Sequence, residues 1–90
     1  MKNNIDKIDW HILNLMADDW ESALTIQQDL KRDNIDLTIG DIIERLEKLH
    51  SDGLVELNPE TKNLKNKWYG MTERGRSIGD EYAKSHGYDE

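Results

Sequence analysis

The sequence contains no cysteine and no phenylalanine among its 90 residues. Without cysteine the chain can form neither a disulfide framework nor a thiolate metal site, which is typical of a cytoplasmic protein. Without phenylalanine the interior has to be built from aliphatic side chains and three tryptophans. Residues 1–4 lack the apolar run of a signal peptide, and no segment is long and apolar enough to span a membrane. We therefore expect a cytoplasmic protein without a membrane partner.

Basic residues are also scarce. Lysine and arginine number 12 against 19 aspartates and glutamates, so the formal net charge is −7. This total counts against nucleic-acid binding, because domains that bind nucleic acid usually carry a net basic face. The charge is unevenly distributed, however. Residues 58–76 hold five basic and two acidic residues, a net charge of +3, which leaves −10 for the rest of the chain.

The length of the chain suits one small domain and is too short for two. Apolar residues keep a regular spacing from Ile5 to Leu57, which argues against disorder. The sequence therefore predicts a single domain over residues 1–90, with a core that covers about residues 5–84.

Three segments place apolar residues at helical spacing. The first predicted helix covers residues 5–17. The second covers residues 26–33, and Thr25 is predicted as its N-cap in a capping box with Gln28. The third begins after the predicted N-cap Thr38 and ends near residue 52. Its predicted inward stripe consists of Ile39, Ile42, Ile43, Leu46 and Leu49.

The end of the third helix is specified by local chemistry. Gly53 suits the left-handed position after the helix, and Leu54 is placed to pack back on Leu49, as in a Schellman motif. The alternation in residues 55–57 predicts a strand. The Asn58-Pro59 pair begins a turn.

The remaining segments complete a small hairpin and a last helix. Residues 60–67 are polar and predict a loop, and residues 68–71 predict the return strand. Thr72 is predicted to cap a helix of about ten residues that ends before Gly87. Gly75 and Gly79 weaken that helix. The predicted class is mainly α with a small β-hairpin: a three-helix bundle, a two- or three-stranded antiparallel wing and a short C-terminal helix.

Two motifs carry a resemblance to known proteins. Residues 46–55, LEKLHSDGLV, resemble the "LxxLxxxGLV" run from recognition helix into wing, and residues 71–76, MTERGR, resemble the "LTexGR" entry to the last helix. Both are typical of winged helix-turn-helix regulators of the MarR, PadR and ArsR kind, including small archaeal and phage repressors. The resemblance covers roughly residues 5–84. It implies a DNA-binding transcriptional regulator, although winged helices also serve as protein-interaction modules.

The resemblance places the third helix in the major groove of double-stranded DNA. Arg45 suits a guanine contact, whereas Asp41 and Glu44 depart from the family pattern. Acidic side chains accept hydrogen bonds from cytosine N4 but repel phosphates. An ordinary solvated face is an equally good interpretation of this helix surface. The candidate DNA-binding residues of the helix are Thr38, Gly40, Asp41, Glu44, Arg45 and Lys48.

The wing carries the second set of candidate DNA contacts. Lys62, Lys65 and Lys67 are placed to reach phosphates or the neighbouring minor groove, and Asn63 and Asn66 supply neutral hydrogen-bonding groups. In the return strand, core packing is favoured for both Trp68 and Tyr69, with the alternative that one of them flanks a ligand or the DNA backbone. The secondary candidates for phosphate contact are Lys31, Arg32, Arg74 and Arg76, the last two with the alternative role of neutralising carboxylates.

A second apolar stripe on the first helix, formed by Trp10, Leu13 and Ala17, suggests a homodimer. In that hypothesis the stripe and the C-terminal helix with Tyr82 meet a second subunit, and the dimer binds two half-sites. The alternative is that the first helix is central and buried on all sides, and the sequence slightly favours it.

Nothing in the sequence indicates catalysis, a metal or a cofactor. The histidines at 11, 50 and 86 lack metal-ligand spacing, and the serines have no nucleophile context. The sequence therefore predicts a non-enzymatic DNA-binding regulator. The alternative is a protein-interaction winged helix that uses the acidic face of its third helix. A protein whose acidic surface mimics DNA ranks last, because the wing is basic.

Overall fold

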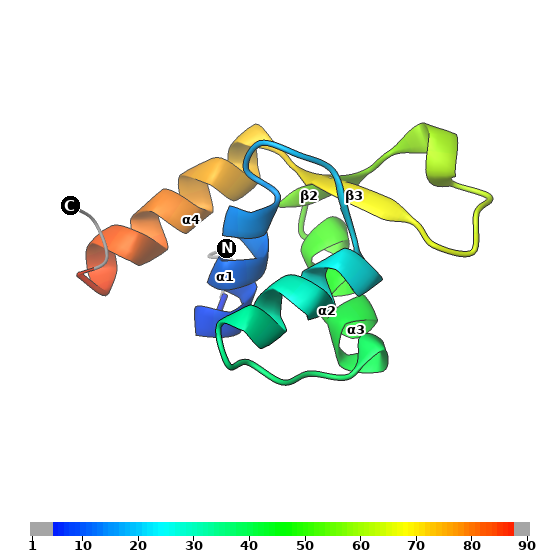
Figure 1. Ribbon diagram of the computed structural model, residues 1–90. Helices are drawn as coiled ribbons and strands as arrows, with labels where there is room; N and C mark the ends of the chain where they lie inside the picture. Colours follow the sequence, from blue (N-terminus) through cyan, green and yellow to red (C-terminus); the bar gives the residue numbers. More distant parts are fainter. Residues whose placement is uncertain (1–4, 88–90) are drawn as a thin grey trace.

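The computed structural model describes residues 5–87 as a helical bundle with a small antiparallel sheet that extends from one side (Figure 1). The three strands lie in the order β1-β3-β2. The predicted winged helix-turn-helix is confirmed, with three strands. In chain order the elements are α1 (Lys7–Leu15), β1 (Glu21–Ser22), α2 (Ala23–Arg32), α3 (Ile39–Ser51), β2 (Val55–Leu57), a 3₁₀ turn (Pro59–Thr61), β3 (Trp68–Met71) and α4 (Glu73–Ser85). Within this described part, no helix has the length and apolar character required to cross a bilayer.

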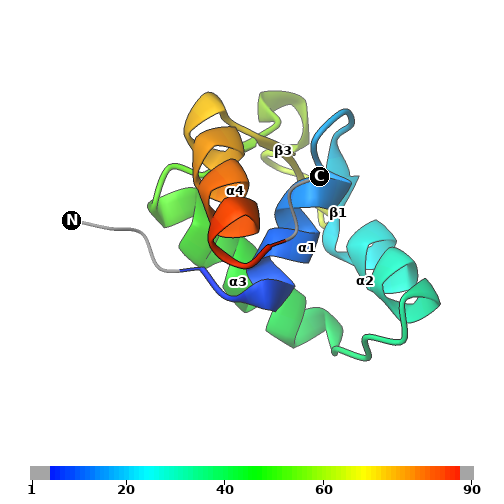
Figure 2. The same cartoon turned by 90° about the vertical axis from the view of Figure 1, so that its left-hand side faces the viewer.

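Helix α1 is the central helix of the bundle. It lies between α4 and α2 (Figure 2) and contacts both. Leu13 is completely buried within its own chain. The structure therefore contradicts a partner-facing stripe that includes Leu13 and supports the alternative of a buried central helix. Trp10 is half-buried and its ring lies 6.1 Å from that of Tyr82 in α4 of the same chain.

Helix α2 begins at Ala23, three residues before the predicted start. Its N-cap is Ser22, whose hydroxyl accepts a hydrogen bond from the Thr25 amide at 3.3 Å, while the Ser22 amide donates to Thr25 Oγ1 at 2.9 Å. The prediction of Thr25 as N-cap is wrong, because Thr25 is the third helical residue of this reciprocal box. Asn34 ends the helix in the left-handed region, with φ +63°.

Helix α3 has the predicted ends. Thr38 Oγ1 accepts from the Asp41 amide at 3.1 Å, which confirms Thr38 as the N-cap. At the other end Gly53 has φ +78°, and the Leu54 amide donates to the Leu49 carbonyl at 2.9 Å. The Gly53 amide donates to the His50 carbonyl at 3.0 Å. These two bonds form the Schellman motif that the sequence predicts.

Three of the five residues of the predicted inward stripe of α3 lie in the core, whereas Ile39 is partly buried and lines a surface cleft together with Ile43. Ile42, Leu46 and Leu49 are buried, whereas Ile43 is 42% exposed. Ile43 lies at the edge of the buried face, where the bundle ends and a surface cleft begins. The sequence places it in the core because its spacing to Ile39 and Leu46 also fits a helical stripe.

The wing is a hairpin built around β3. Strand β2 pairs with β3 in the register Val55↔Met71 and Leu57↔Tyr69, which confirms both predicted strands. Beyond the strands, the Trp68 amide donates to the hydroxyl of the buried Thr61 at 3.0 Å and holds the base of the loop. The hairpin extends away from the helices (Figure 1).

Helix α4 begins at the predicted cap and runs 13 residues, longer than predicted. The Gly75 amide donates to Thr72 Oγ1 at 3.0 Å. A Cβ on Gly75 would overlap the carbonyl oxygen of Leu54 and lie 3.0 Å from Met71 Cγ. Glycine at this position therefore lets the first turn of α4 approach the junction between α3 and β2.

Candidate nucleic-acid interface

Four of the six candidate residues of α3 line an acidic hollow on the side of the helix that faces α1. The hollow has a volume of about 530 Å³. Its carboxylates are not arranged so that three or more could hold one metal ion, and no such group occurs elsewhere in residues 5–87. Its lining residues are Asp6, Asp9, Leu37, Asp41, Glu44, Arg45 and Lys48.

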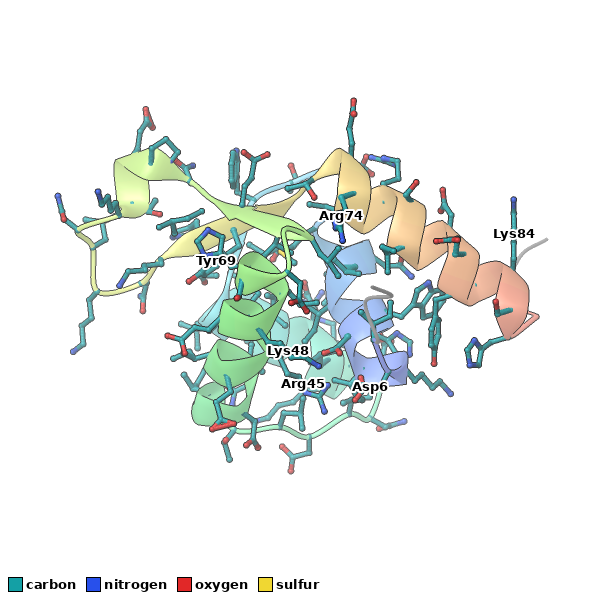
Figure 3. All side chains as sticks on the ribbon, turned by 180° about the vertical axis from the view of Figure 1, so that it is seen from behind. Asp6, Arg45, Lys48, Tyr69, Arg74 and Lys84 are labelled. Carbon is teal, nitrogen blue, oxygen red and sulfur yellow. The ribbon has the colours of Figure 1, made fainter. Side chains whose placement is uncertain are left out.

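Arg45 links α3 to the start of α1 (Figure 3). Its Nη1 donates to both oxygens of Asp6, at 2.9 and 3.0 Å, and to Asp9 Oδ1 at 2.8 Å. The side chains of Arg45 and Asp9 are 29% and 7% exposed. Partial burial works to raise the pKa of Asp6, but hydrogen bonds from the Asp9 amide and from Arg45 hold that pKa below its ordinary value. Nη1 is therefore engaged by two carboxylates that neutralise the charge of Arg45, which argues against its use as a guanine contact.

The outer face of α3 is acidic once Arg45 is paired. Asp41, Glu44 and Glu47 are exposed, and Lys48 is the exposed cation among them. The Thr38 hydroxyl serves as the helix cap. Gly40 is exposed, and a Cβ there would meet only Thr38 Oγ1, at 3.8 Å. Four of the six candidates of this helix, Asp41, Glu44, Arg45 and Lys48, thus line one hollow, but their summed charge does not favour phosphates.

An apolar cleft separates α3 from the wing. It has a volume of about 450 Å³. Leu24 and Ile43 are 46% and 42% exposed in it. At its base Tyr69 (Figure 3) has a pKa raised by burial and by the nearby charge of Glu47. The cleft is lined by Ala23, Leu24, Ile39, Ile43, Leu46, Glu47, His50, Leu57, Lys65, Asn66, Lys67 and Tyr69.

The cleft brings together residues that sequence reasoning missed. Leu24 precedes the predicted start of the second helix at residue 26, and the helical spacing predicts Ile43 in the core. Glu47 falls within the motif of residues 46–55 but is not among the predicted DNA-binding residues. The sequence does contain a signal for Glu47. It lies one helical turn after Ile43 and Glu44, so it shares their side of α3.

The wing carries the exposed positive charge of the candidate interface. Lys62, Lys65 and Lys67 are exposed, and none of them takes part in an ion pair recorded among residues 5–87. The seven residues from Thr61 to Lys67 include no carboxylate. This segment is therefore a local cationic surface on an acidic chain.

The secondary basic candidates lie elsewhere and have different surroundings. Arg32 forms an exposed ion pair with Asp29 of the same helix, at 3.5 Å. Arg76 Nη2 donates to the Ala17 carbonyl at 3.3 Å and so links α4 to the residues that follow α1. Lys31 is exposed on α2, and Arg74 lies at the start of α4 (Figure 3). These residues do not form one surface with the wing lysines.

Comparison with known proteins gives matches among solved structures. No family model and no curated protein matches the chain. The zinc-responsive MarR family member ZitR of Lactococcus lactis superposes with a TM-score of 0.73 at 19% identity, over 98% of this chain and 58% of that chain. Wild-type ZitR in complex with DNA gives 0.72 at 20% identity, over 98% and 57%. RosR of H. salinarum gives 0.76 at 18% identity, over 96% and 78%.

These similarities establish the winged helix-turn-helix fold that the sequence motifs imply, in the form seen in ZitR and RosR. The chain spans a little more than half the length of ZitR. At these identities the likeness concerns the fold, and the roles of individual residues have to be argued from this chain.

Proposed function

We propose that this chain is a DNA-binding winged-helix domain that acts in transcription regulation, and that its wing leads the binding. The observation that carries the proposal is the carboxylate-free segment 61–67, with three exposed lysines on a chain of net charge −7. The same fold occurs in ZitR bound to DNA, which supports the assignment. ZitR is a zinc-responsive MarR family member, which supports a regulatory role for this chain.

In this proposal the wing supplies most of the affinity. Lys62, Lys65 and Lys67 contact phosphates, and each contact releases condensed counterions from the duplex. Asn66 donates a neutral hydrogen bond to the DNA beside these lysines. Lys48 on α3 adds one further phosphate contact at the edge of the acidic face.

Helix α3 contributes specificity rather than affinity. The exposed methyl groups of Ile43 suit thymine C5-methyl groups, and the carboxylates of Asp41 and Glu44 accept from cytosine N4. Gly40 lets the helix approach the groove closely, and Thr38 fixes the helix start. Arg45 was predicted to contact guanine, and its three hydrogen bonds to Asp6 and Asp9 favour a structural role instead.

A salt titration tests the proposal. Affinity for random-sequence duplex is measured from low salt to about 0.15 M, where the screening length is about 8 Å. Replacing Lys62, Lys65 and Lys67 with alanine should lower the slope of log affinity against log salt by about 3, because each phosphate contact contributes about 0.9. The affinity of the variant should fall by a similar factor for every duplex sequence.

A matched pair of single variants provides the control. Lys65→Ala should lower the slope by about 1, whereas Lys84→Ala removes the same charge at the far end of α4 (Figure 3) and should leave it unchanged. If the wild type binds no duplex at any salt, or if the triple variant keeps the wild-type slope, the proposal is wrong.

The acidic face of α3 supports a second candidate, binding of a basic protein segment. Its specific observation is the exposure of Asp41, Glu44 and Glu47 while Arg45 is paired. Binding of a lysine-rich peptide that Glu44→Gln and Glu47→Gln weaken, without duplex binding, would favour this candidate. For DNA, Glu44→Gln should strengthen nonspecific binding if Glu44 lies near phosphates, and should lower specificity if it accepts from cytosine.

We also propose that the DNA-binding form is a homodimer with half-sites about one helical turn apart. Leu13 is buried, so the proposed interface consists of α4 with the half-buried Trp10 and Ala17. Light scattering tests this directly. A wild type that remains monomeric at high concentration removes the dimer and the paired half-sites.

A further inference from the structure

The wing carries one large apolar side chain without a packing role. Four large hydrophobic residues are exposed in the described chain, and Leu64 is the most exposed, at 53%. The ring of Trp20 lies on Gly70, and Leu24 and Ile43 line the cleft. Leu64 neither lines the cleft nor packs against the core cluster.

The residues around Leu64 give this exposure a chemical context. It is flanked in the chain by Lys62, Asn63, Lys65 and Asn66, all exposed and none acidic. Lysine and asparagine are side chains that hydrogen-bond in the minor groove. Proteins that bend DNA from that groove often insert an apolar side chain between two base pairs. A leucine surrounded by cations and amides combines both requirements.

The segment that carries Leu64 is also anchored by hydrogen bonds at its start. The Leu64 amide donates to the Thr61 carbonyl at 3.0 Å, and the Thr61 hydroxyl donates to the Asn58 carbonyl at 2.8 Å. Below the loop, β3 is paired on both sides, with β1 and with β2. These bonds connect the segment that carries Leu64 to a strand that is paired on both edges.

We propose that Leu64 is a minor-groove wedge that partly unstacks one flexible base step, flanked by A·T pairs. This inference rests on the proposed function and adds the kind of DNA that the domain prefers. Pyrimidine–purine steps such as TA unstack easily, whereas A-tracts are stiff. The sequence preference then comes from the deformability of the DNA and does not require base contacts from α3. This suits a protein whose third helix is acidic.

The experiment compares two duplexes of equal length and composition. One has a central TA step with 2-aminopurine beside it, and the other has the same fluorophore within an A-tract. The wild type should raise the fluorescence of the TA duplex and bind it about fivefold more tightly, the value expected for burying the exposed half of a leucine side chain. Leu64→Ala should remove both effects while keeping the wild-type salt slope.

Two control variants make the result specific. Leu64→Met retains a long apolar side chain and should restore the fluorescence change. Leu24→Ala removes an equally exposed leucine from the cleft and should leave the TA preference intact. Circular dichroism should show that all three variants fold, because neither leucine is buried.

The failures of the two proposals are distinguishable. If the wild type binds both duplexes equally, or Leu64→Ala keeps the TA preference and the fluorescence change, the wedge is wrong and wing-led DNA binding stands. If the wild type binds neither duplex at any salt concentration, the proposed function is wrong and the wedge with it.

Discussion

Two glycines in α4 allow a sharp test of the packing. Gly75→Ala and Gly79→Ala make the same chemical change in one helix, and each should gain about 1 kcal/mol of helix propensity. At Gly75 the new Cβ would overlap the Leu54 carbonyl oxygen, a backbone atom that also accepts from the Thr72 amide at 3.1 Å. At Gly79 the Cβ would lie 4.0 Å from Trp10 Cδ1, an ordinary contact.

The two variants should therefore change stability in opposite directions. Overpacking against a backbone atom costs about 3 kcal/mol, so Gly75→Ala should lose about 2 kcal/mol after the propensity gain. Gly79→Ala should gain about 0.5–1 kcal/mol. For a domain of this size 1 kcal/mol corresponds to about 4–8 °C in Tm, so the two variants should differ by at least about 10 °C.

Thermal melts followed by circular dichroism, with urea titrations for the free energy of unfolding, measure both effects. The m-value should stay constant if only native packing changes. Equal Tm values for the two variants, or a stabilised Gly75→Ala, would show that α4 does not pack against the α3–β2 junction as described.

Three further substitutions test the core and the α1–α3 link. Leu46→Ala should cost about 2–5 kcal/mol because Leu46 is fully buried, and an unchanged melt would mean that the α3 stripe is misassigned. Leu13→Glu should unfold the domain, because it buries a charge; a folded monomer by circular dichroism and light scattering would restore the free-stripe hypothesis. Desolvation by burial works to raise the pKa of Asp6, but the net pKa in the folded protein is lowered. The Asp6 carboxylate therefore stabilises the fold above about pH 4, and this stabilisation is lost as the pH falls through the folded pKa. Asp6→Asn keeps a capping oxygen and should lower stability near pH 7 by less than about 1 kcal/mol, since Asp6 is more than half exposed. In strong acid the variant should be as stable as the wild type. A difference in stability that persists in strong acid would refute the charge argument.

The features that the sequence predicted correctly are those with local signals. The Thr38 cap and the Gly53–Leu54 end of α3 depend on residues within one turn of each other. The two strands of the wing follow from alternation bounded by turn residues. Such patterns can be recognised without knowledge of the tertiary structure.

The features that the sequence did not predict depend on contacts between distant segments. Arg45 pairs with Asp6 and Asp9, which are 39 and 36 residues away in the chain. Ile43 is exposed because the wing stands away from α3 and leaves a cleft, and spacing alone cannot show that. The N-cap of α2 is Ser22 and not the predicted Thr25. Serine and threonine are both favoured at N-caps, so the sequence alone does not distinguish the two positions.

The extension of the wing from the bundle has a consequence for long-range electrostatics. The molecule measures 37 × 29 × 22 Å, and the far end of α4 and the tip of the wing lie at opposite ends (Figure 1). At physiological ionic strength the Debye length is about 8 Å, so a polyanion at the wing tip does not sense the carboxylates at that far end. In dilute buffer the Debye length reaches about 30 Å and the whole acidic body repels the polyanion. Added salt therefore screens an unfavourable interaction as well as a favourable one. The net dependence of affinity on salt should be shallower than the proposed phosphate contacts of the wing lysines and Lys48 alone would give.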